Sequence, residues 1–384
     1  MGPMARAAQD VRLIIAASEL DSNLYYATQF LAPDAFIFLQ ANGRKTLLMN
    51  DLELDRAKAQ STVDEVLSYS DYEAKARAEL GAAPTLAQTV AVLLRERGAT
   101  RLLVPADFPL QQADRLRAAG FTVDAQPDPF FPERVVKRPD EIDAIVAAQQ
   151  ATETAVDEAI QLIAESRIQN DLLYPPGDGG DQPLTSERIK QVINLKLMEL
   201  GFVAQHTIVA CGEQACDPHN EGSGPLRAHQ PIIMDVFPRS SSTRYFADMS
   251  RTVVKGRATD GQKRLYDLVL QAQELAFGQI RADANGQAIH ESILDLFERA
   301  GCRTGMINGR MQGFFHGTGH GVGLDIHEAP RISRSGARLP AGTVVTVEPG
   351  LYYPDIGAVR LEDMVVVTET GCRNLTTYPK VLEV

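Results

Sequence analysis

Two pairs of carboxylates interrupt otherwise apolar strand-like segments in the second half of this chain of 384 residues. Asp235 lies in PIIMDVF and Asp248 in RYFADMSRTVV, and the PRSSSTR segment between them is rich in turn-forming residues. If the chain reverses about Ser241 and Ser242, the two aspartates are equidistant from the turn. They then face each other across a β-hairpin with their Cβ atoms about 5 Å apart.

The same spacing recurs in a second segment. Glu348 in TVVTVEPGLYY and Glu362 in AVRLEDMVVV are equidistant from Asp355 in YPDIG, which predicts another hairpin with opposed carboxylates. Four carboxylates on apolar strands cannot all stay ionised without cations, because close like charges and burial both raise the pKa of a carboxyl group. A single acidic residue on a strand usually faces solvent, but two symmetric pairs indicate a site for divalent metal ions.

A glycine-rich segment, HGTGHGVGLDIHE, adds imidazoles. It contains His316, His320 and His327, three of the seven histidines in the chain, and its glycines allow the backbone to approach a buried ion closely. The spacing is neither that of an H-E-x-x-H zinc helix nor that of a G-x-G-x-x-G dinucleotide loop. The cluster therefore favours a functional role. Three further histidines lie outside the motifs and are expected to have surface or core roles: His206, His229 and His290.

Composition excludes several classes of protein. A formal charge of −12 leaves no basic stripe for nucleic acid, and no apolar stretch has the length of a membrane span or the pattern of a secretory signal. Four scattered cysteines are too few for a disulfide scaffold. Cys211 and Cys216 have C-x4-C spacing without a second pair and are expected to be thiols rather than metal ligands. We expect a cytoplasmic protein without nucleic-acid or membrane partners.

The order of apolar runs predicts two domains, and a hydrophobic content of 44% supports two sizeable cores. In the first part, short strand-like runs such as VRLIIAAS and AFIFLQ alternate with helical patterns such as LAQTVAVLLRERG, which indicates an α/β domain. The proline-rich stretch QPDPFFPERVVKRPD interrupts regular structure and predicts a boundary. We expect one domain over residues 1–132 and a second over residues 133–384.

The second part has a different pattern. A long helical segment begins at Asp140, with acidic residues in its first turn, and TSERIKQVINLKLMELG predicts another helix. Strand-like runs then alternate with two amphipathic helices near residues 261–281 and 286–300. This pattern predicts a mixed sheet backed by helices.

The strings MDVFPRSSSTRYFADMSRT, HGTGHGVGLDIHE, TVEPGLYY and RLEDMVVVTETG resemble the signature blocks of the creatinase, aminopeptidase P and prolidase family of pita-bread metallopeptidases. The resemblance covers residues 135–384, and the first part is similar to the N-terminal domain that this family usually carries. It implies an α+β protein with a C-terminal pita-bread catalytic domain and a smaller N-terminal α/β domain. The implied activity is hydrolysis of the bond before proline in Xaa-Pro dipeptides or short Xaa-Pro peptides.

The resemblance also implies cofactors and residue roles. Two divalent ions (manganese, cobalt or zinc) would be held by five ligands: Asp235, Asp248, His320, Glu348 and Glu362. Asp248 and Glu362 would bridge the ions, and Glu348 would also carry a proton. Three histidines would hold the substrate and the oxyanion: His219, His316 and His327. Arg360 would orient Glu362, and Arg331 would bind the carboxylate of a dipeptide.

Several alternatives stay open at this point. The chain reads DVFP after the first ligand, where many relatives have Asp-x-Gly, so the exact substrate is undecided, and an Xaa-Pro aminopeptidase acting on longer peptides is one candidate. Methionine aminopeptidases share the chemistry but usually lack such an N-terminal domain. Creatinase-like C–N hydrolases work without metals, and non-catalytic relatives have typically lost ligands, whereas this chain has all five. The resemblance also implies a homodimer.

Overall fold

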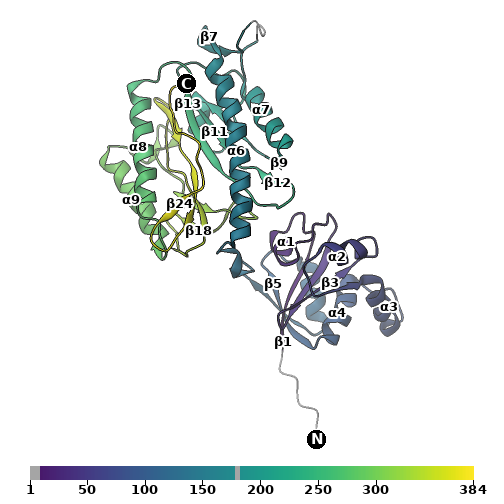
Figure 1. Ribbon diagram of the computed structural model, residues 1–384. Coiled ribbons are helices and arrows are strands. Elements are labelled where there is room, and N and C mark those ends of the chain that lie inside the picture. Colours follow the sequence, from purple (N-terminus) through teal and green to yellow (C-terminus); the bar gives the residue numbers. More distant parts are fainter. Residues whose placement is uncertain (1–8, 178–181) are drawn as a thin grey trace. The chain divides into compact units, whose positions relative to one another are not determined.

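The computed structural model describes residues 9–177 and 182–384 (Figure 1). The chain divides into two compact units, Met1–Arg134 and Val135–Val384. Each unit has hydrophobic cores of its own. In the described part of the chain, every helix is too short or too polar to cross a membrane.

The first unit is built on a six-stranded sheet with the strand order β4-β3-β2-β1-β5-β6. The strands are β1 (Gln9–Ala16), β2 (Phe36–Ala41), β3 (Arg44–Met49), β4 (Glu65–Ser68), β5 (Ala99–Pro105) and β6 (Thr122–Gln126). The helices are α1 (Ser22–Thr28), α2 (Leu54–Gln60), α3 (Tyr69–Leu80), α4 (Leu86–Glu96) and α5 (Leu110–Ala118), and a short 3-10 helix, η1 (Pro132–Arg134), follows β6. One core joins the sheet to α3, α4 and α5, and another joins it to α1 and α2. This arrangement confirms the α/β domain predicted from the sequence.

Four helices dominate the second unit, and all four occur where the sequence predicts helices: α6 (Pro139–Glu165), α7 (Ser186–Glu199), α8 (Asp260–Phe277) and α9 (Gly286–Arg299). α6 starts with Pro139 at its first position, and the Glu141 carboxylate accepts a 2.7 Å hydrogen bond from the Arg138 backbone N–H. α8 starts with a capping box between Thr259 and Gln262.

The strands that carry the predicted site form three antiparallel sheets. One has the order β10-β11-β13, one has the order β18-β17-β20-β23-β24, and β21 pairs with β22. Their bounds are β10 (Ile208–Cys211), β11 (Pro231–Val236), β13 (Met249–Val254), β17 (Gly319–Gly321), β18 (Glu328–Ile332), β20 (Val344–Val347), β21 (Gly350–Tyr353), β22 (Gly357–Arg360), β23 (Asp363–Val367) and β24 (Cys372–Asn374).

The prediction of a mixed sheet in this unit is wrong. Every ladder between its named strands in the described ranges is antiparallel, and no α-helix crossover lies between paired strands of the three sheets that carry the predicted site. The short elements are β7 (Arg167–Gln169), β8 (Leu172–Tyr174), β9 (Phe202–Val203), η2 (Gly212–Cys216), β12 (Arg239–Ser240), β14 (Ala284–Asn285), β15 (Gly305–Ile307), β16 (Arg310–Gln312) and β19 (Arg338–Leu339).

Two cores hold these sheets against the helices. One joins α6 and α7 to β10, β11 and β13, and the other joins α8 and α9 to β20, β22 and β23. In Figure 1, α8 and α9 (green) lie on one side of the strands and α7 (teal) lies on the other. The β10-β11-β13 sheet is joined to the segment that carries Glu362 by a backbone hydrogen bond of 3.1 Å, in which the N–H of Glu362 donates to the carbonyl oxygen of Ser250. Both acidic hairpins therefore converge on one place.

The second acidic hairpin has the predicted register. Tyr353 pairs with Gly357 about a turn centred on Asp355, and the same register continues beyond a short gap, where Val347 pairs with Asp363. Glu348 and Glu362 lie opposite each other within that gap.

The first acidic hairpin differs from the prediction by one residue in the position of its turn. Asp235 pairs with Ser250 rather than with Asp248, and the turn is centred between Ser242 and Thr243. The reason is local: the Ser240 hydroxyl accepts hydrogen bonds from the backbone N–H groups of Ser242 and Thr243. Asp248 is consequently a diagonal neighbour of Asp235 on the same face of the sheet.

Candidate metal centre

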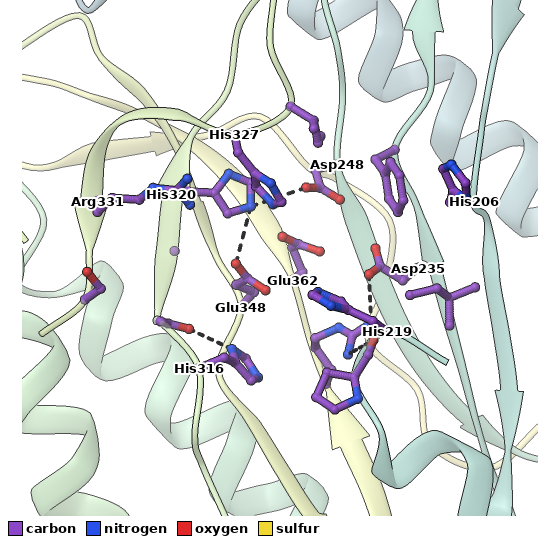
Figure 2. Close-up of a pocket in the computed structure, with 18 of the residues that line it drawn as sticks. His206, His219, Asp235, Asp248, His316, His320, His327, Arg331, Glu348 and Glu362 are labelled. Atoms are coloured by element: carbon purple, nitrogen blue, oxygen red, sulfur yellow. Dashed lines mark hydrogen bonds and ion pairs between the residues drawn. The ribbon is translucent and has the colours of Figure 1, made fainter. Parts of the chain in front are cut away.

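All ten residues that the sequence singled out line one pocket of about 870 Å³ in the second unit. They are His219, Asp235, Asp248, His316, His320, His327, Arg331, Glu348, Arg360 and Glu362. Figure 2 shows the four carboxylates and His320 directed toward a common space in this pocket. The two acidic hairpins supply the carboxylates, while β17 and the loop that follows it supply His320 and His327.

Three of the expected ligands lie close enough together to bind one ion. Asp248, His320 and Glu362 are buried, and each offers a ligand atom within 4.8 Å of those of the other two. Glu348 joins this group through its Oε1, which lies 3.4 Å from His320 Nε2. Asp235 lies on the other side of the group, where its Oδ2 accepts a 2.7 Å hydrogen bond from Arg360.

The protonation of His320 shows that the cluster suits a cation. Its Nδ1 lies 3.1 Å from the Gly321 carbonyl oxygen and must be the nitrogen that carries the proton. Burial lowers the pKa of His320 to about 3, so the ring is neutral and Nε2 presents a lone pair. That lone pair faces Asp248 Oδ2 at 3.6 Å and Glu348 Oε1 at 3.4 Å. These electron-rich atoms repel one another unless a proton or a metal ion lies between them.

Two further carboxylate oxygens support the same conclusion. Among the described residues, Asp235 Oδ1 and Glu362 Oε1 are buried and have no hydrogen-bond partner. A buried acceptor without a partner is costly, and the cost is greater for an ionised group. The donor set therefore fits divalent metal ions by its chemistry, since it combines hard carboxylate oxygens with one neutral imidazole.

The carboxyl groups have the perturbed acidities that burial of like charges produces. Burial, followed by the charges of Glu362 and Asp235, raises the pKa of Asp248. Burial, followed by the charges of Glu348 and Asp235, raises the pKa of Glu362. Burial also raises the pKa of Glu348 to about 7. A carboxyl group with this pKa can either hold or release a proton near neutral pH.

Arg360 acts on the carboxylates of both hairpins. Its Nη2 donates to Asp235 at 2.7 Å, and its Nε donates at 2.9 Å to the hydroxyl of Ser250. That hydroxyl donates at 2.9 Å to Glu362 Oε2. Arg360 thus contacts Asp235 directly and is connected to Glu362, which the resemblance implied that it orients, through the Ser250 hydroxyl. Ser250 was not identified from the sequence, although its position two residues after Asp248 places it on the same face of the strand.

His316 belongs to a hydrogen-bonded chain. Its Nδ1 lies 2.8 Å from the Gly317 carbonyl oxygen and must be protonated, so Nε2 accepts from the Tyr352 hydroxyl at 2.8 Å. Tyr352 in turn accepts from Arg360 Nη1 at 3.1 Å. Both nitrogens of His316 are therefore occupied within the protein, and a direct contact with substrate requires one of these bonds to break. Tyr352 was also missed, because its strand positions were interpreted only as hairpin structure.

Three further residues expected to bind the substrate lie on the exposed part of the pocket wall. His219, His327 and Arg331 are exposed, and the ring of His327 stacks edge-on against that of His320 with centroids 4.4 Å apart. His206 also lines the pocket, although the sequence suggested only a surface or core role. It is exposed, and its Nδ1 lies 2.7 Å from Glu221.

The other two histidines outside the motifs do not line the pocket. His290 is buried and hydrogen-bonded to Thr318, and His229 accepts a hydrogen bond from the Arg257 backbone N–H. The four cysteines are free thiols.

Two protein-family models match this chain, one in each unit. The model of metallopeptidase family M24 matches residues 143–369, and that of the creatinase/prolidase N-terminal domain matches residues 4–129. The chain belongs to metallopeptidase family M24. The family resemblance found in the sequence motifs is confirmed, and metallopeptidases of this family use divalent metal, with which the buried Asp248, His320 and Glu362 are compatible.

Relatives within the M24 family include an Xaa-Pro dipeptidase of Pyrococcus furiosus, 29% identical over 245 residues, which are 63% of each chain. A second relative, an uncharacterized peptidase of Bacillus subtilis, is 37% identical over 46% of this chain and 47% of its own. The chain thus matches less than two thirds of the length of these relatives. Among solved structures, an X-Pro aminopeptidase of Thermotoga maritima has a TM-score of 0.80 at 24% identity, covering 98% of both chains. These similarities confirm the pita-bread fold and the smaller creatinase-like N-terminal domain.

Proposed function

We propose that this protein is a metal-dependent peptidase that hydrolyses the bond before proline in Xaa-Pro dipeptides or short Xaa-Pro peptides. The observation that carries the proposal is the convergence of four carboxylates and a neutral imidazole in one pocket. The Xaa-Pro preference is supported by the names of its relatives, an Xaa-Pro dipeptidase and an X-Pro aminopeptidase. We extend that preference from them to this chain.

The metal site in this proposal has five ligands: Asp235, Asp248, His320, Glu348 and Glu362. Two divalent ions of manganese, cobalt or zinc would activate water and polarise the scissile carbonyl. Asp248 and Glu362 would contribute to both ions, as the family resemblance implies; both are buried, and the charges of Asp235 and Glu348 act on each.

Other side chains of the pocket would act on the substrate. Glu348 would pass a proton to the leaving nitrogen, because its carboxyl group lines the pocket with Oε1 3.4 Å from His320 Nε2, beside the metal ions that would activate water. Arg331 is an exposed cation at the rim of the pocket and is suited to bind the carboxylate of a dipeptide. His219 and His327, also exposed in the pocket, would donate hydrogen bonds to the substrate and to the developing oxyanion.

His316 is assigned an indirect role. Its hydrogen bonds to Gly317 and Tyr352 keep it neutral and fixed, and Tyr352 joins it to Arg360. This series of hydrogen bonds orients the pocket wall beside Glu348, and His316 does not supply a free hydrogen-bond donor to the substrate.

The proposal is tested with metal-stripped protein that is reloaded with manganese, cobalt or zinc. Each form is assayed against an Xaa-Pro dipeptide, an Xaa-Pro tripeptide and a methionyl peptide without proline. We expect metal-dependent cleavage before proline, and the ratio of dipeptide to tripeptide turnover decides between dipeptidase and aminopeptidase. Asp248→Asn is the control variant, because it keeps the size of the side chain and removes one ligand charge.

Two results would contradict the proposal. Cleavage of the methionyl peptide in preference to both proline peptides would identify a methionine aminopeptidase. Absence of any turnover with metal demonstrably bound would mean that the substrate class is wrong.

Three further expectations belong to the proposal. Free thiols support a reducing compartment such as the cytoplasm. We expect residues 1–132 and 133–384 to act as separate domains, and we expect a homodimer. Light scattering that detects only a monomer at micromolar concentration would exclude the dimer.

A further inference from the structure

Arg251 is a fully buried cation directly behind the candidate metal centre. It lies on β13, a strand of the first acidic hairpin, and its side chain contacts Asp363 at the start of β23; only 2% of its surface is exposed. Burial of a guanidinium group is costly unless every donor is satisfied. The contacts of Arg251 therefore indicate what the side chain holds in place.

The guanidinium group donates hydrogen bonds to backbone carbonyl groups of both acidic hairpins. Nη1 donates at 2.7 Å to the carbonyl oxygen of Glu362 and at 2.9 Å to that of Ser250. The same Ser250 carbonyl accepts the 3.1 Å hydrogen bond from the backbone N–H of Glu362. Arg251 thus adds a second connection between the two acidic hairpins, beside this backbone hydrogen bond.

The other side of the guanidinium group is held by Asp363 and by the last segment of the chain. Nη2 lies 3.0 Å from Asp363 Oδ1 and donates at 2.7 Å to the Tyr378 carbonyl oxygen, while Nε donates at 3.2 Å to that of Pro379. Asp363 is fully buried, and its Oδ2 accepts from Lys380 Nζ at 2.6 Å. The segment 378–380 therefore fixes Arg251 in one orientation.

We propose that Arg251 is a positioning residue for the metal ligand Glu362, and that Asp363 and Lys380 hold it in place. The proposal rests on the proposed function in one respect, since it assumes that the site binds divalent cations. None of the three residues lines the pocket. A positioning effect on a metal ion would therefore pass through the backbone of Ser250 and Glu362.

The direction of the change in metal affinity after removal of Arg251 distinguishes a positioning role from a direct electrostatic effect. Arg251 is a positive charge close to a cation site, so its removal should by Coulomb's law strengthen metal binding. If Arg251 instead fixes the geometry of Glu362, its removal should weaken metal binding despite the lost repulsion. A purely structural role would lower thermal stability and leave the affinity for metal unchanged.

The test is calorimetric titration of metal-free, full-length protein with Mn²⁺, for the wild type and for Arg251→Met, Arg251→Lys and Lys380→Met. We expect the dissociation constant of Arg251→Met to rise about 10- to 100-fold, the usual effect of losing a residue that supports a metal ligand. Arg251→Lys should show a smaller loss, because lysine keeps the charge without the planar fork. Lys380→Met should lose about two- to fivefold, as is usual for one partly exposed ion pair.

Lys263→Met is the matched control. Lys263 lies 3.0 Å from Glu383 in the same terminal segment, but it does not contact Arg251 or Asp363. Its loss should leave the dissociation constant for Mn²⁺ unchanged. If Arg251→Met does not fold, as judged by circular dichroism, the lysine variant and Lys380→Met decide the question.

The outcomes are distinct. Tighter binding or unchanged binding by the Arg251 variants would overturn the inference. A wild-type protein that binds no divalent cation would overturn the proposed metal centre itself, and the inference with it. The visible spectrum of the Co²⁺-loaded proteins supplies a second readout, because a displaced Glu362 should alter the coordination of the ion.

Discussion

The buried carboxyl groups of the metal-free protein should contribute less stability as the pH rises, in contrast to ordinary ion-paired carboxylates. Burial raises the pKa of Glu348 from 4.5 to about 7, and burial with neighbouring charges also raises the pKa values of Asp248 and Glu362. A carboxyl group whose pKa is higher in the folded protein binds more protons when folded. Its contribution is therefore fully present below the unfolded pKa and is lost as the pH rises through the folded pKa. For Glu348 that window extends from pH 4.5 to about 7.

Buried histidines act in the opposite direction over part of the same range. Burial lowers the pKa values of His316 and His320 to about 3, so their contribution to stability is lost as the pH falls below 6.5. Comparison with a Glu348→Gln variant cancels this effect, because the histidines remain. A pKa raised from 4.5 to about 7 corresponds to about 3 kcal/mol. Between about pH 5 and pH 8 the wild type should therefore lose about 2–3 kcal/mol more unfolding free energy than the variant.

Urea unfolding of both metal-free proteins, followed by circular dichroism across this pH range, measures the difference. The reasoning fails if the two proteins show the same dependence on pH, or if the wild type gains stability relative to the variant. Saturating Mn²⁺ should stabilise the wild type more at about pH 8 than at about pH 5, because the ligands must lose their protons to bind metal.

Three substitutions, one of them with a control variant, test other contacts of the site. Tyr352→Phe removes the hydroxyl that joins His316 to Arg360, so kcat/KM for an Xaa-Pro dipeptide should fall about two- to tenfold. Calorimetry should find an unchanged affinity for Mn²⁺. Gly319→Ala places a Cβ atom 1.9 Å from the carbonyl oxygen of Thr346, so unfolding free energy should fall by about 1–3 kcal/mol in urea titrations. Gly371→Ala has no neighbour within 4 Å and should be nearly neutral. Arg331→Met should raise KM for a dipeptide about tenfold with little change in kcat, because an exposed cation at the rim serves binding rather than chemistry.

The second acidic hairpin could be predicted residue by residue because its turn is short and its symmetry is unambiguous. Tyr353 and Gly357 flank Asp355 and establish the register that places Glu348 opposite Glu362. Helices of the second unit could be predicted for a similar reason, since their periodicity and their capping residues agree.

Contacts between distant segments could not be predicted in the same way. Ser250 matters because it lies between Arg360 and Glu362, and Tyr352 matters because it lies between Arg360 and a histidine. These contacts depend on how three separate strands are placed in space, and no local pattern reports that placement. Arg251 is a similar case, because its role depends on a segment more than a hundred residues later in the chain.

The displaced turn of the first hairpin still leaves both aspartates on the same face of the sheet. A turn displaced by one residue shifts the pairing of the strands by two residues, so Asp235 faces Ser250 in place of Asp248. Side chains in a strand alternate between faces with a period of two, and a shift of two therefore keeps both aspartates on the same face. A shift of one residue would have directed Asp248 into the opposite core. The residue gained opposite Asp235 is Ser250, whose hydroxyl links Arg360 to Glu362 and so connects the two hairpins.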